Sequence, residues 1–286
     1  MAIKTIDYLD ELKLGSEKTK EKEKDLRVLS LGAGVQSSTL FYKIINNEVE
    51  PVDCGIFADT GNEPREVYDY LQYIKSLSNF PIYIVSKGNI IDDSLAVAQK
   101  GTNKGFLTMP VKGVDDNGKQ VLGRKQCTND YKIQPINKKI RELLGVKNLR
   151  GFNVEVVMGI SLDEIQRAKE PRNKLQINCY PLIQNKITRH DCLDYIKKYN
   201  YKTPPRSACI VCPYHSNKEW IYMRENNPDE FLFAVNFDIK IRNASSNGVK
   251  NYLHSSLKPL GEIDFNQYKD PQYKLFDDEC EGICGV

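Results

Sequence analysis

The segment VLSLGAGVQSSTL, residues 28–40, decides the fold of this chain. Its first four residues are largely apolar, which is typical of the end of a parallel strand that is covered on both faces. The small residues GAG at 32–34 allow a sharp turn and a close approach to a ligand. The apolar pattern from Leu40 onward predicts a helix. The segment therefore predicts a strand, a tight turn and a helix in that order.

A turn of this kind has two interpretations. The backbone N–H groups at the start of a helix, together with the helix dipole, suit a phosphate group. Alternatively, the small residues only allow the strand and the helix to pack closely. In the first interpretation, the cofactor-binding residues of the turn are Gly32, Ala33, Gly34, Gln36, Ser37 and Ser38.

The composition is that of an ordinary globular protein. The 286 residues are 40% hydrophobic and 28% charged, and the formal net charge of +3 is too small to indicate nucleic-acid binding by itself. No apolar run is long enough to span a bilayer, and the start of the chain lacks the apolar core of a signal peptide. We therefore expect a cytoplasmic protein with no membrane partner. In that compartment, its eight cysteines favour metal or redox chemistry over disulfides.

Strand-like apolar runs alternate with helix-like segments along the chain. After residues 28–31, further strands are expected near 52–58, 81–85 and 154–158. This alternation predicts an α/β fold with a Rossmann-like, doubly wound parallel sheet. Residues 100–123 show little periodicity and are expected to form a long loop. Helices are expected at 65–77, at 136–144 and from 188 onward.

Three parts of the chain differ in character. Residues 1–25 include a mixed charge run and are expected to be a peripheral segment. Residues 26–203 carry the alternation and are predicted to form a nucleotide-binding domain. Residues 204–286 contain the motif Cys-x-x-Cys, an aromatic helical segment and a tail with two further cysteines. They are predicted to form an added C-terminal module.

Four short blocks resemble the PP-loop ATP pyrophosphatases, in the branch that contains phosphoadenosine phosphosulfate reductase. GAGVQS at 32–37 stands where that superfamily has Ser-Gly-Gly-x-Asp-Ser, and DTG at 59–61 resembles the reductases' Asp-Thr-Gly. CTNDYKIQP at 127–135 is similar to the Cys-Cys-x-x-Arg-Lys-x-x-Pro segment of iron–sulfur adenylylsulfate reductases. Residues 159–167 are similar to Gly-x-Arg-x-Asp-Glu-Ser. The blocks follow the family's order within residues 26–215.

The resemblance implies an enzyme that binds ATP or an adenylyl sulfonucleotide. It implies that Gly159 lies close to the ribose and that Arg167 holds a phosphate or sulfate through its guanidinium fork. The alternative for Arg167 is a surface ion pair with Asp163. Gln36 replaces the Asp of the family's loop, which leaves a bound Mg²⁺ open. The residues expected to border the adenosine are Asp59, Thr60 and Gly61.

Three cysteines form the second predicted site. Thiolates are soft ligands, and the turn of Cys209 and Cys212 can place two of them on one metal centre. The resemblance adds Cys127 and implies a 4Fe-4S cluster, with Lys132 acting on it electrostatically in a catalytic role. The alternatives are a zinc site completed by His215 or a tail cysteine, and a free dithiol.

The tail carries a further candidate. Cys280 stands in Glu-Cys-Glu-Gly-Ile-Cys-Gly, where the reductases have a catalytic Cys in Glu-Cys-Gly-x-His, but the His is absent here. The resemblance therefore implies a catalytic Cys280, while Cys284 stays without an assigned role. Acidic neighbours of Cys280 disfavour its thiolate form, which is the nucleophile.

Three functions are compatible with these motifs. The preferred one is ATP-dependent sulfur chemistry, in which the enzyme adenylylates an acceptor such as a nucleic acid, releases pyrophosphate and inserts sulfur. The second is a true sulfonucleotide reductase that releases sulfite. The third is a nucleotide-binding module without catalysis. Either enzyme would need a sulfur or electron donor protein, and the sequence leaves the oligomeric state open, a homodimer included.

Overall fold

The structure is a computed structural model that describes residues 24–99, 107–169, 171, 174–244 and 248–268. The chain divides into two compact units, each made of several segments. The first unit contains the described parts of Met1–Ala58, Glu66–Val85 and Ile136–Ser207, and the second contains those of Asp59–Arg65, Ser86–Pro135 and Ala208–Val286. The division into a charged segment (1–25), a nucleotide-binding domain (26–203) and a cysteine-containing module (204–286) stays a prediction.

A five-stranded sheet forms the centre of the first unit. Its strand order is β3-β2-β1-β6-β7, and β1 runs parallel to both β2 and β6, as β6 does to β7. The bounds are β1 Leu26–Leu31, β2 Cys54–Asp59, β3 Ile82–Ser86, β6 Val154–Met158 and β7 Gln176–Cys179. This α/β architecture confirms the predicted Rossmann-like, doubly wound sheet.

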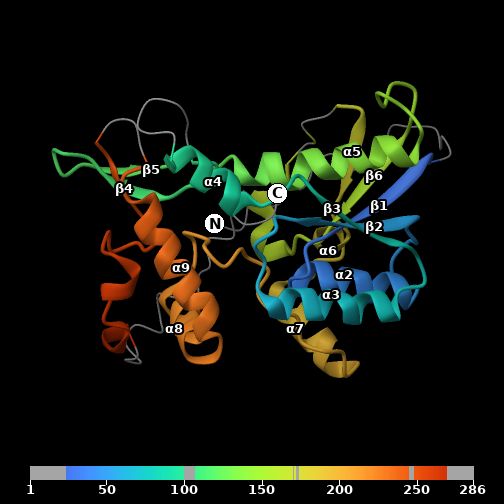
Figure 1. The fold of residues 1–286 in the computed structure, drawn as a ribbon. Helices are drawn as coiled ribbons and strands as arrows, with labels where there is room; N and C mark the ends of the chain where they lie inside the picture. Colours follow the sequence, from blue (N-terminus) through green and yellow to red (C-terminus); the bar gives the residue numbers. More distant parts are fainter. Residues whose placement is uncertain (1–23, 100–106, 170, 172–173, 245–247, 269–286) are drawn as a thin grey trace, which may run out of the picture. The chain divides into compact units, whose positions relative to one another are not determined.

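Helices cover both faces of this sheet (Figure 1). On one face, α2 Val35–Ile45, α3 Arg65–Leu77 and α7 Arg189–Lys198 pack against the strands in one apolar core. On the other face, α5 Gln134–Leu143 contributes Ile140 to a second core. Burial on both faces explains why the strands are apolar runs rather than alternating patterns. The short helix α6 Pro181–Gln184 and the 3₁₀ turn η2 Leu162–Arg167 complete this unit.

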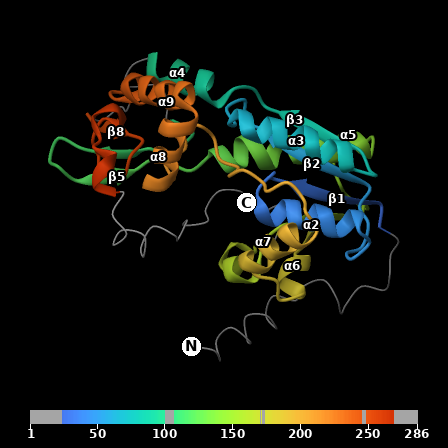
Figure 2. The ribbon, with the colours of Figure 1, turned by 90° about the horizontal axis from the view of Figure 1, so that it is seen from below.

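The second unit is built around a different core. Its helices are α4 Ile90–Gln99, α8 Asn217–Asn226 and α9 Pro228–Ile241, and its sheet has the order β5-β4-β8. Figure 2 shows α8 beside α9. Fully buried aromatic side chains, Trp220, Phe237 and Phe265 among them, fill the interior. The remaining elements are β4 Lys112–Val114, β5 Gln120–Leu122, β8 Lys250–Tyr252, the π-helix η1 Thr128–Ile133, η3 Leu260–Glu262 and η4 Phe265–Tyr268.

The predicted long loop is wrong over residues 107–123. Residues 112–122 form the antiparallel hairpin of β4 and β5, closed by a turn in which the carboxylate of Asp115 accepts the backbone N–H groups of Asn117 and Lys119. β4 also pairs with β8, which lies more than 130 residues later in the sequence. Strands of three residues are too short to show a period, so the sequence pattern missed them. Residues 100–106 lie outside the described part of the chain.

Among the helices of the described residues, none combines the length and the apolar composition needed to cross a membrane.

Candidate functional site

The strand order of the first unit reverses between β1 and β6. Strands β2 and β3 follow β1 on one side, whereas β6 and β7 lie on the other. The loops that leave the carboxyl ends of β1 and β6 therefore diverge at this point, where open α/β sheets bind their ligands. These loops begin at Gly32 and Gly159, two of the predicted cofactor-binding residues.

The first loop is held in shape by Ser37. Its hydroxyl accepts the N–H of Gly32 at 3.2 Å and donates to the carbonyl of Gly34 at 3.2 Å. The residue in the left-handed region is Ala33, with φ of 56°, while neither glycine of the loop has a positive φ. The sharp turn was predicted, but its location on Ala33 was not. Ser37 thus orders the loop through its own hydrogen bonds to the loop backbone.

Gly159 makes the closest backbone approach of this site. A Cβ on Gly159 would lie 2.5 Å from Cα of Ser37 and 2.6 Å from its nitrogen. No side chain fits there without moving one of the two loops, so glycine is required by packing. By contrast, a Cβ on Gly34 would meet only Cβ of Ser207, at 3.7 Å. The two loops at the strand reversal therefore touch through their backbones.

Helix α2 begins directly after the first loop. Its N-cap, Gly34, provides no side-chain hydrogen bond, and its first turn contains no acidic residue. The first N–H groups of the helix are thus not capped by a side chain, and the positive end of the dipole is not offset by a carboxylate. Ser38 is fully buried, and its predicted role in cofactor binding stays a prediction.

Gln36 connects the loop to two other elements of the first unit. Its side-chain nitrogen lies 3.5 Å from the hydroxyl of Ser161, and its side-chain oxygen accepts a hydrogen bond of 3.2 Å from Arg189. The backbone N–H of Arg189 in turn donates to Asp163 at 3.0 Å. The sequence analysis missed Arg189, because nothing in the motif Thr-Arg-His-Asp indicates a contact with the loop. Arg189 therefore brings a guanidinium beside the side chain of Gln36 in the first turn of α2.

Arg167 pairs with Glu164, three residues earlier in η2. The predicted alternative, an ion pair with Asp163 on a helix, is wrong, because the segment is a 3₁₀ turn, in which residues three apart come together. Asp163 instead accepts the N–H of Arg189. Whether Arg167 binds phosphate or sulfate stays a prediction.

The segment DTG at 59–61 is a structural turn of the second unit. The carboxylate of Asp59 accepts the N–H of Gly61 at 2.7 Å, and Gly61 has a φ of 73°, where a side chain is strained. The side chain of Asn89 donates to the carbonyl of Gly61 at 3.0 Å. Thr60 is buried and lines the thiol pocket described next. The predicted role of Asp59, Thr60 and Gly61 beside an adenosine stays a prediction.

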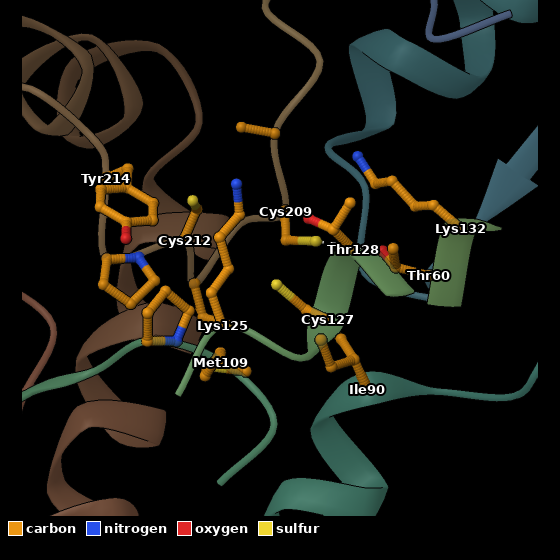
Figure 3. A pocket seen from close by; sticks show the side chains of 14 residues that line it. Thr60, Ile90, Met109, Lys125, Cys127, Thr128, Lys132, Cys209, Cys212 and Tyr214 are labelled. Atoms are coloured by element: carbon orange, nitrogen blue, oxygen red, sulfur yellow. Dashed lines mark hydrogen bonds between the residues drawn. The ribbon is translucent and has the colours of Figure 1, made fainter. Parts of the chain in front are cut away.

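A pocket in the second unit brings together the three predicted cysteines, Lys132 and Thr60 (Figure 3). We call it the thiol pocket. Cys127 lies more than 80 residues before Cys209 and Cys212 in the sequence, yet all three line one cavity. Apart from those five, its lining is mostly apolar or basic: Ile90, Met109, Pro110, Lys125, Thr128, Ala208, Val211, Pro213 and Tyr214.

Cys209 has the most distinctive surroundings in the thiol pocket. Its sulfur lies 3.1 Å from the hydroxyl of Thr60 and 3.9 Å from a carboxylate oxygen of Glu63. Burial raises the pKa of the Cys209 thiol, the carboxylate of Glu63 raises it further, and Lys132 opposes them. Glu63 is itself only 3% exposed. Glu63 follows the DTG segment directly in the sequence but was not among the predicted site residues.

The Cys-x-x-Cys turn is closed by its own backbone and by a histidine. The carbonyl of Cys209 accepts the N–H of Cys212 at 2.9 Å and lies 2.9 Å from Nε2 of His215. The ring of His215 packs edge-on against buried Trp220 at 4.6 Å between centroids. Through Nε2, His215 therefore supports the turn that presents Cys209 and Cys212.

Cys127 lies at the start of the π-helix η1. Its N–H donates to the carbonyl of Thr108 at 2.9 Å, which fixes the entry of the helix. Tyr131, fully buried in η1, donates from its hydroxyl to Asp93. A π-helical turn is a rare geometry that occurs frequently at functional sites. It places Cys127, Thr128 and Lys132 on the thiol pocket.

The three thiols do not form a ligand set as they stand. In the described part of the chain, no group of three or more His, Cys, Asp or Glu side chains has the spacing that holds a metal ion. Nε2 of His215 already contacts the carbonyl of Cys209 in the Cys-x-x-Cys turn. The geometry of the described residues therefore does not support the predicted 4Fe-4S cluster, whereas the zinc alternative completed by a tail cysteine involves residues outside the described part and stays a prediction.

Three further cysteines are packing residues. Cys54 and Cys192 are buried and Cys179 is half-buried, as expected for small apolar side chains. Burial raises the pKa of Cys54 to about 12 and the pKa values of Cys179 and Cys192 to about 11. Cys280 and Cys284 lie outside the described residues. Their predicted roles stay predictions.

No protein-family model and no curated protein matches this chain. A solved structure that is similar to it is that of phosphoadenylyl-sulfate (PAPS) reductase from Candida auris in a phosphate complex. That protein is 15% identical, and the match covers 64% of this chain and 76% of the other, with a TM-score of 0.40. An identity and a TM-score this low do not transfer an activity from one protein to the other.

Proposed function

We propose that this chain is a PP-loop enzyme, similar to the phosphoadenosine phosphosulfate reductase family, that carries out nucleotide-dependent sulfur chemistry. The first unit would bind an adenine nucleotide, and the second would supply thiols. The observation that carries the proposal is the backbone contact of Gly159 with Ser37 at the strand reversal. Doubly wound folds bind their ligands in the crevice between the loops that diverge at such a reversal.

The nucleotide half of the proposal depends on three features of the first loop. The N-terminus of α2 is not capped by a side chain, the loop is ordered by Ser37, and Arg189 adds a positive charge beside Gln36. Backbone N–H groups and a guanidinium together suit a phosphate chain. No carboxylate extends from the loop, which is consistent with binding of the phosphates without a loop-bound metal ion.

The reaction that we propose begins at the α-phosphate of ATP. A carbonyl oxygen of the acceptor attacks the α-phosphorus, the bond to the β-phosphate oxygen breaks, and pyrophosphate leaves with the electron pair. A sulfur nucleophile then attacks the carbon that bears this oxygen, the C–O bond breaks, and AMP leaves with the oxygen and the electron pair. The Arg189 guanidinium and the amides of α2 would stabilise the charge that develops on the phosphate oxygens. Mg²⁺, if bound with the nucleotide, would neutralise part of the same charge.

The thiol half of the proposal depends on the convergence of Cys127, Cys209 and Cys212 on one pocket. Neighbouring thiols can carry sulfur as a persulfide, or electrons as a disulfide. Lys125 and Lys132 line the same pocket, and Lys132 opposes the rise that burial and Glu63 cause in the pKa of Cys209. The acceptor would be a small molecule or a nucleic acid, and the sulfur donor a separate protein.

One experiment separates the three functional classes. The full chain is mixed under anaerobic conditions with ATP or with adenylyl sulfate and phosphoadenylyl sulfate, and pyrophosphate, sulfite and heat of binding are measured. Binding of ATP with slow pyrophosphate release supports the proposal. Sulfite release from a sulfonucleotide would favour a reductase, and binding without any product would favour a module without catalysis. Absence of nucleotide binding would overturn the assignment of the loop.

A further inference from the structure

Helix α9, Pro228–Ile241, has one face in the core of the second unit. Ala234, Phe237 and Ile241 are buried there among other apolar side chains. Asp238 lies on the same side and accepts the backbone N–H groups of Leu253 and Leu260. These buried contacts and hydrogen bonds attach the helix to its unit.

The opposite face of α9 is also apolar. Leu232, Phe233 and Ile239 are 58%, 41% and 60% exposed, although each is a large hydrophobic residue. Three exposed polar residues lie on the same side of the helix. Counted from Asp229, the six residues follow at intervals of three, four, seven, ten and eleven positions, which is the spacing of one helix face. We call this face the exposed stripe: Asp229, Leu232, Phe233, Asn236, Ile239 and Lys240.

A helix with apolar side chains on two opposite faces requires two apolar partners. Single exposed hydrophobic residues are common, but a continuous stripe of them marks an interaction surface. The core of the second unit is the first partner. We propose that the second partner of α9 is the α9 of another copy of this chain, packed against it in an antiparallel homodimer.

The charges of the exposed stripe favour a second copy. Asp229 lies in the first turn of α9 and Lys240 in the last. An antiparallel pair about a twofold axis brings the acidic start of each helix to the basic end of the other, and each pairing occurs twice. The rise of 1.5 Å per residue separates Asp229 from Lys240 of the partner subunit by about 4.5 Å along the axis. A parallel pair would place like charges side by side.

The twofold axis falls at Asn236, midway between Leu232 and Lys240 in the stripe. In that register Phe233 packs on Ile239 of the partner subunit, and Leu232 packs on the carbon stem of the partner's Lys240. The two Asn236 side chains then meet at the axis. An Asn pair at the centre of a helical interface fixes register and orientation, because each amide needs the other as its hydrogen-bond partner.

The size of the stripe sets the expected affinity. A helix of 14 residues is about 21 Å long, which is short of the surface that a tight dimer buries. We therefore expect a reversible dimer with a dissociation constant on the order of micromolar. This inference concerns assembly and does not depend on the proposed function.

Sedimentation of the full chain at rising concentration tests the dimer. The wild-type chain is expected to pass from monomer to dimer, whereas Ile239→Glu is expected to raise the dissociation constant at least tenfold. Leu122→Glu is the matched control, because Leu122 is also 60% exposed but lies in β5. Circular dichroism confirms that each variant is folded. A chain that is monomeric at all concentrations overturns the proposal, as does a dimer that Leu122→Glu weakens equally.

A charge exchange tests the orientation. Asp229→Lys is expected to weaken the dimer, since it places a lysine near Lys240 of the partner subunit. The double variant Asp229→Lys, Lys240→Asp is expected to restore it. If the double variant stays as weak as the single one, the antiparallel register is wrong. Both positions are exposed, so neither change removes a buried contact.

Discussion

The guanidinium of Arg189 donates a hydrogen bond of 3.2 Å to the side-chain oxygen of Gln36. The two residues are 153 positions apart in the sequence and belong to the first turns of α7 and α2. Gln36 stands where the resembling family has an Asp, and an Asp would form an ion pair with this guanidinium. Gln36 instead orients Arg189 without neutralising it, which keeps a positive charge beside the loop.

The first prediction follows from this pair. Arg189→Gln is expected to lower the affinity of the full chain for ATP about tenfold, because a charge-assisted hydrogen bond to phosphate is worth roughly 1.5–3 kcal/mol. Isothermal calorimetry at fixed ionic strength measures the change. Arg150→Gln serves as control, since Arg150 is exposed in the same unit and lies outside the loop. Equal loss in both variants would contradict a specific role for Arg189.

The second prediction concerns Gly159. Gly159→Ala is expected to cost about 1–3 kcal/mol of stability and to abolish nucleotide binding, because its Cβ would overlap the backbone of Ser37 at 2.5 Å. Gly55→Ala is the matched control: Gly55 lies in β2, outside both loops, and its Cβ would make only ordinary contacts, 3.4 Å to Ile82 and 3.5 Å to Phe80. Thermal unfolding and ATP titration of both variants give the comparison. A tolerated Gly159→Ala would show that the loops separate easily.

The third prediction concerns Glu63 and Cys209. The carboxylate of Glu63 raises the pKa of the Cys209 thiol, so Glu63→Gln is expected to lower that pKa. Below the pKa, each unit of decrease multiplies the thiolate fraction about tenfold. Alkylation of Cys209 by iodoacetamide at pH 7.5, followed by peptide mass spectrometry, should therefore become faster. The thiol of Cys54, buried in the first unit, provides the internal reference. Slower alkylation of Cys209 would indicate that Glu63 accepts its proton instead.

The fourth prediction separates the two halves of the proposed reaction. Cys209→Ser is expected to leave pyrophosphate release within about twofold of the wild type and to abolish sulfur transfer, since the thiol pocket belongs to the second unit. Iron, sulfide and zinc are measured on the same anaerobic sample. Stoichiometric metal that is lost in Cys209→Ser would show that the thiols regroup into a ligand set. Loss of pyrophosphate release would contradict the separation of roles.

The fifth prediction concerns His254 and pH. Its Nε2 donates to Asn217 at 2.7 Å, and its Nδ1 accepts the N–H of Ser256 at 3.1 Å, so the ring is neutral. Burial lowers the pKa of His254 to about 4 in the folded protein, below its ordinary value of 6.5. The unfolded chain therefore binds this proton first, and stability is expected to fall as the pH drops from 6.5 toward 4, by up to about 3 kcal/mol.

Chemical unfolding between pH 4 and pH 7 tests this dependence. His254→Gln keeps a hydrogen-bonding side chain but cannot bind the proton, so its unfolding free energy should vary less over this range. Other histidines and carboxylates also titrate there, and the difference between the two proteins isolates the contribution of His254. Identical slopes for the two proteins would contradict the prediction.

Much of the first unit could be predicted from the sequence. Strands that are buried on both faces produce apolar runs, and Val28–Leu31 and Val154–Met158 were recognised by that signal. Amphipathic α3 was predicted at its observed bounds, Arg65–Leu77, because its buried residues follow a helical period. These features are local, so the sequence carries them within one window.

Features that join distant segments could not be predicted in the same way. The hairpin of β4 and β5 is stabilised by β8, and Arg189 reaches Gln36 only because α7 and α2 pack on the same face of the sheet. Glu63 beside Cys209 is a contact across 146 positions. No local period or motif records such contacts, since they arise when secondary structures pack.

The sequence by itself determined the doubly wound sheet, the glycine-rich turn after its first strand and the separate Cys-x-x-Cys motif. Period and backbone freedom are properties of neighbouring residues, and they suffice for these features. Only the tertiary structure decided that Cys127, Cys209 and Cys212 share one pocket, and that α9 exposes large apolar side chains on a second face. Burial and mutual distance are set by the packing of the whole chain, which no stretch of sequence contains.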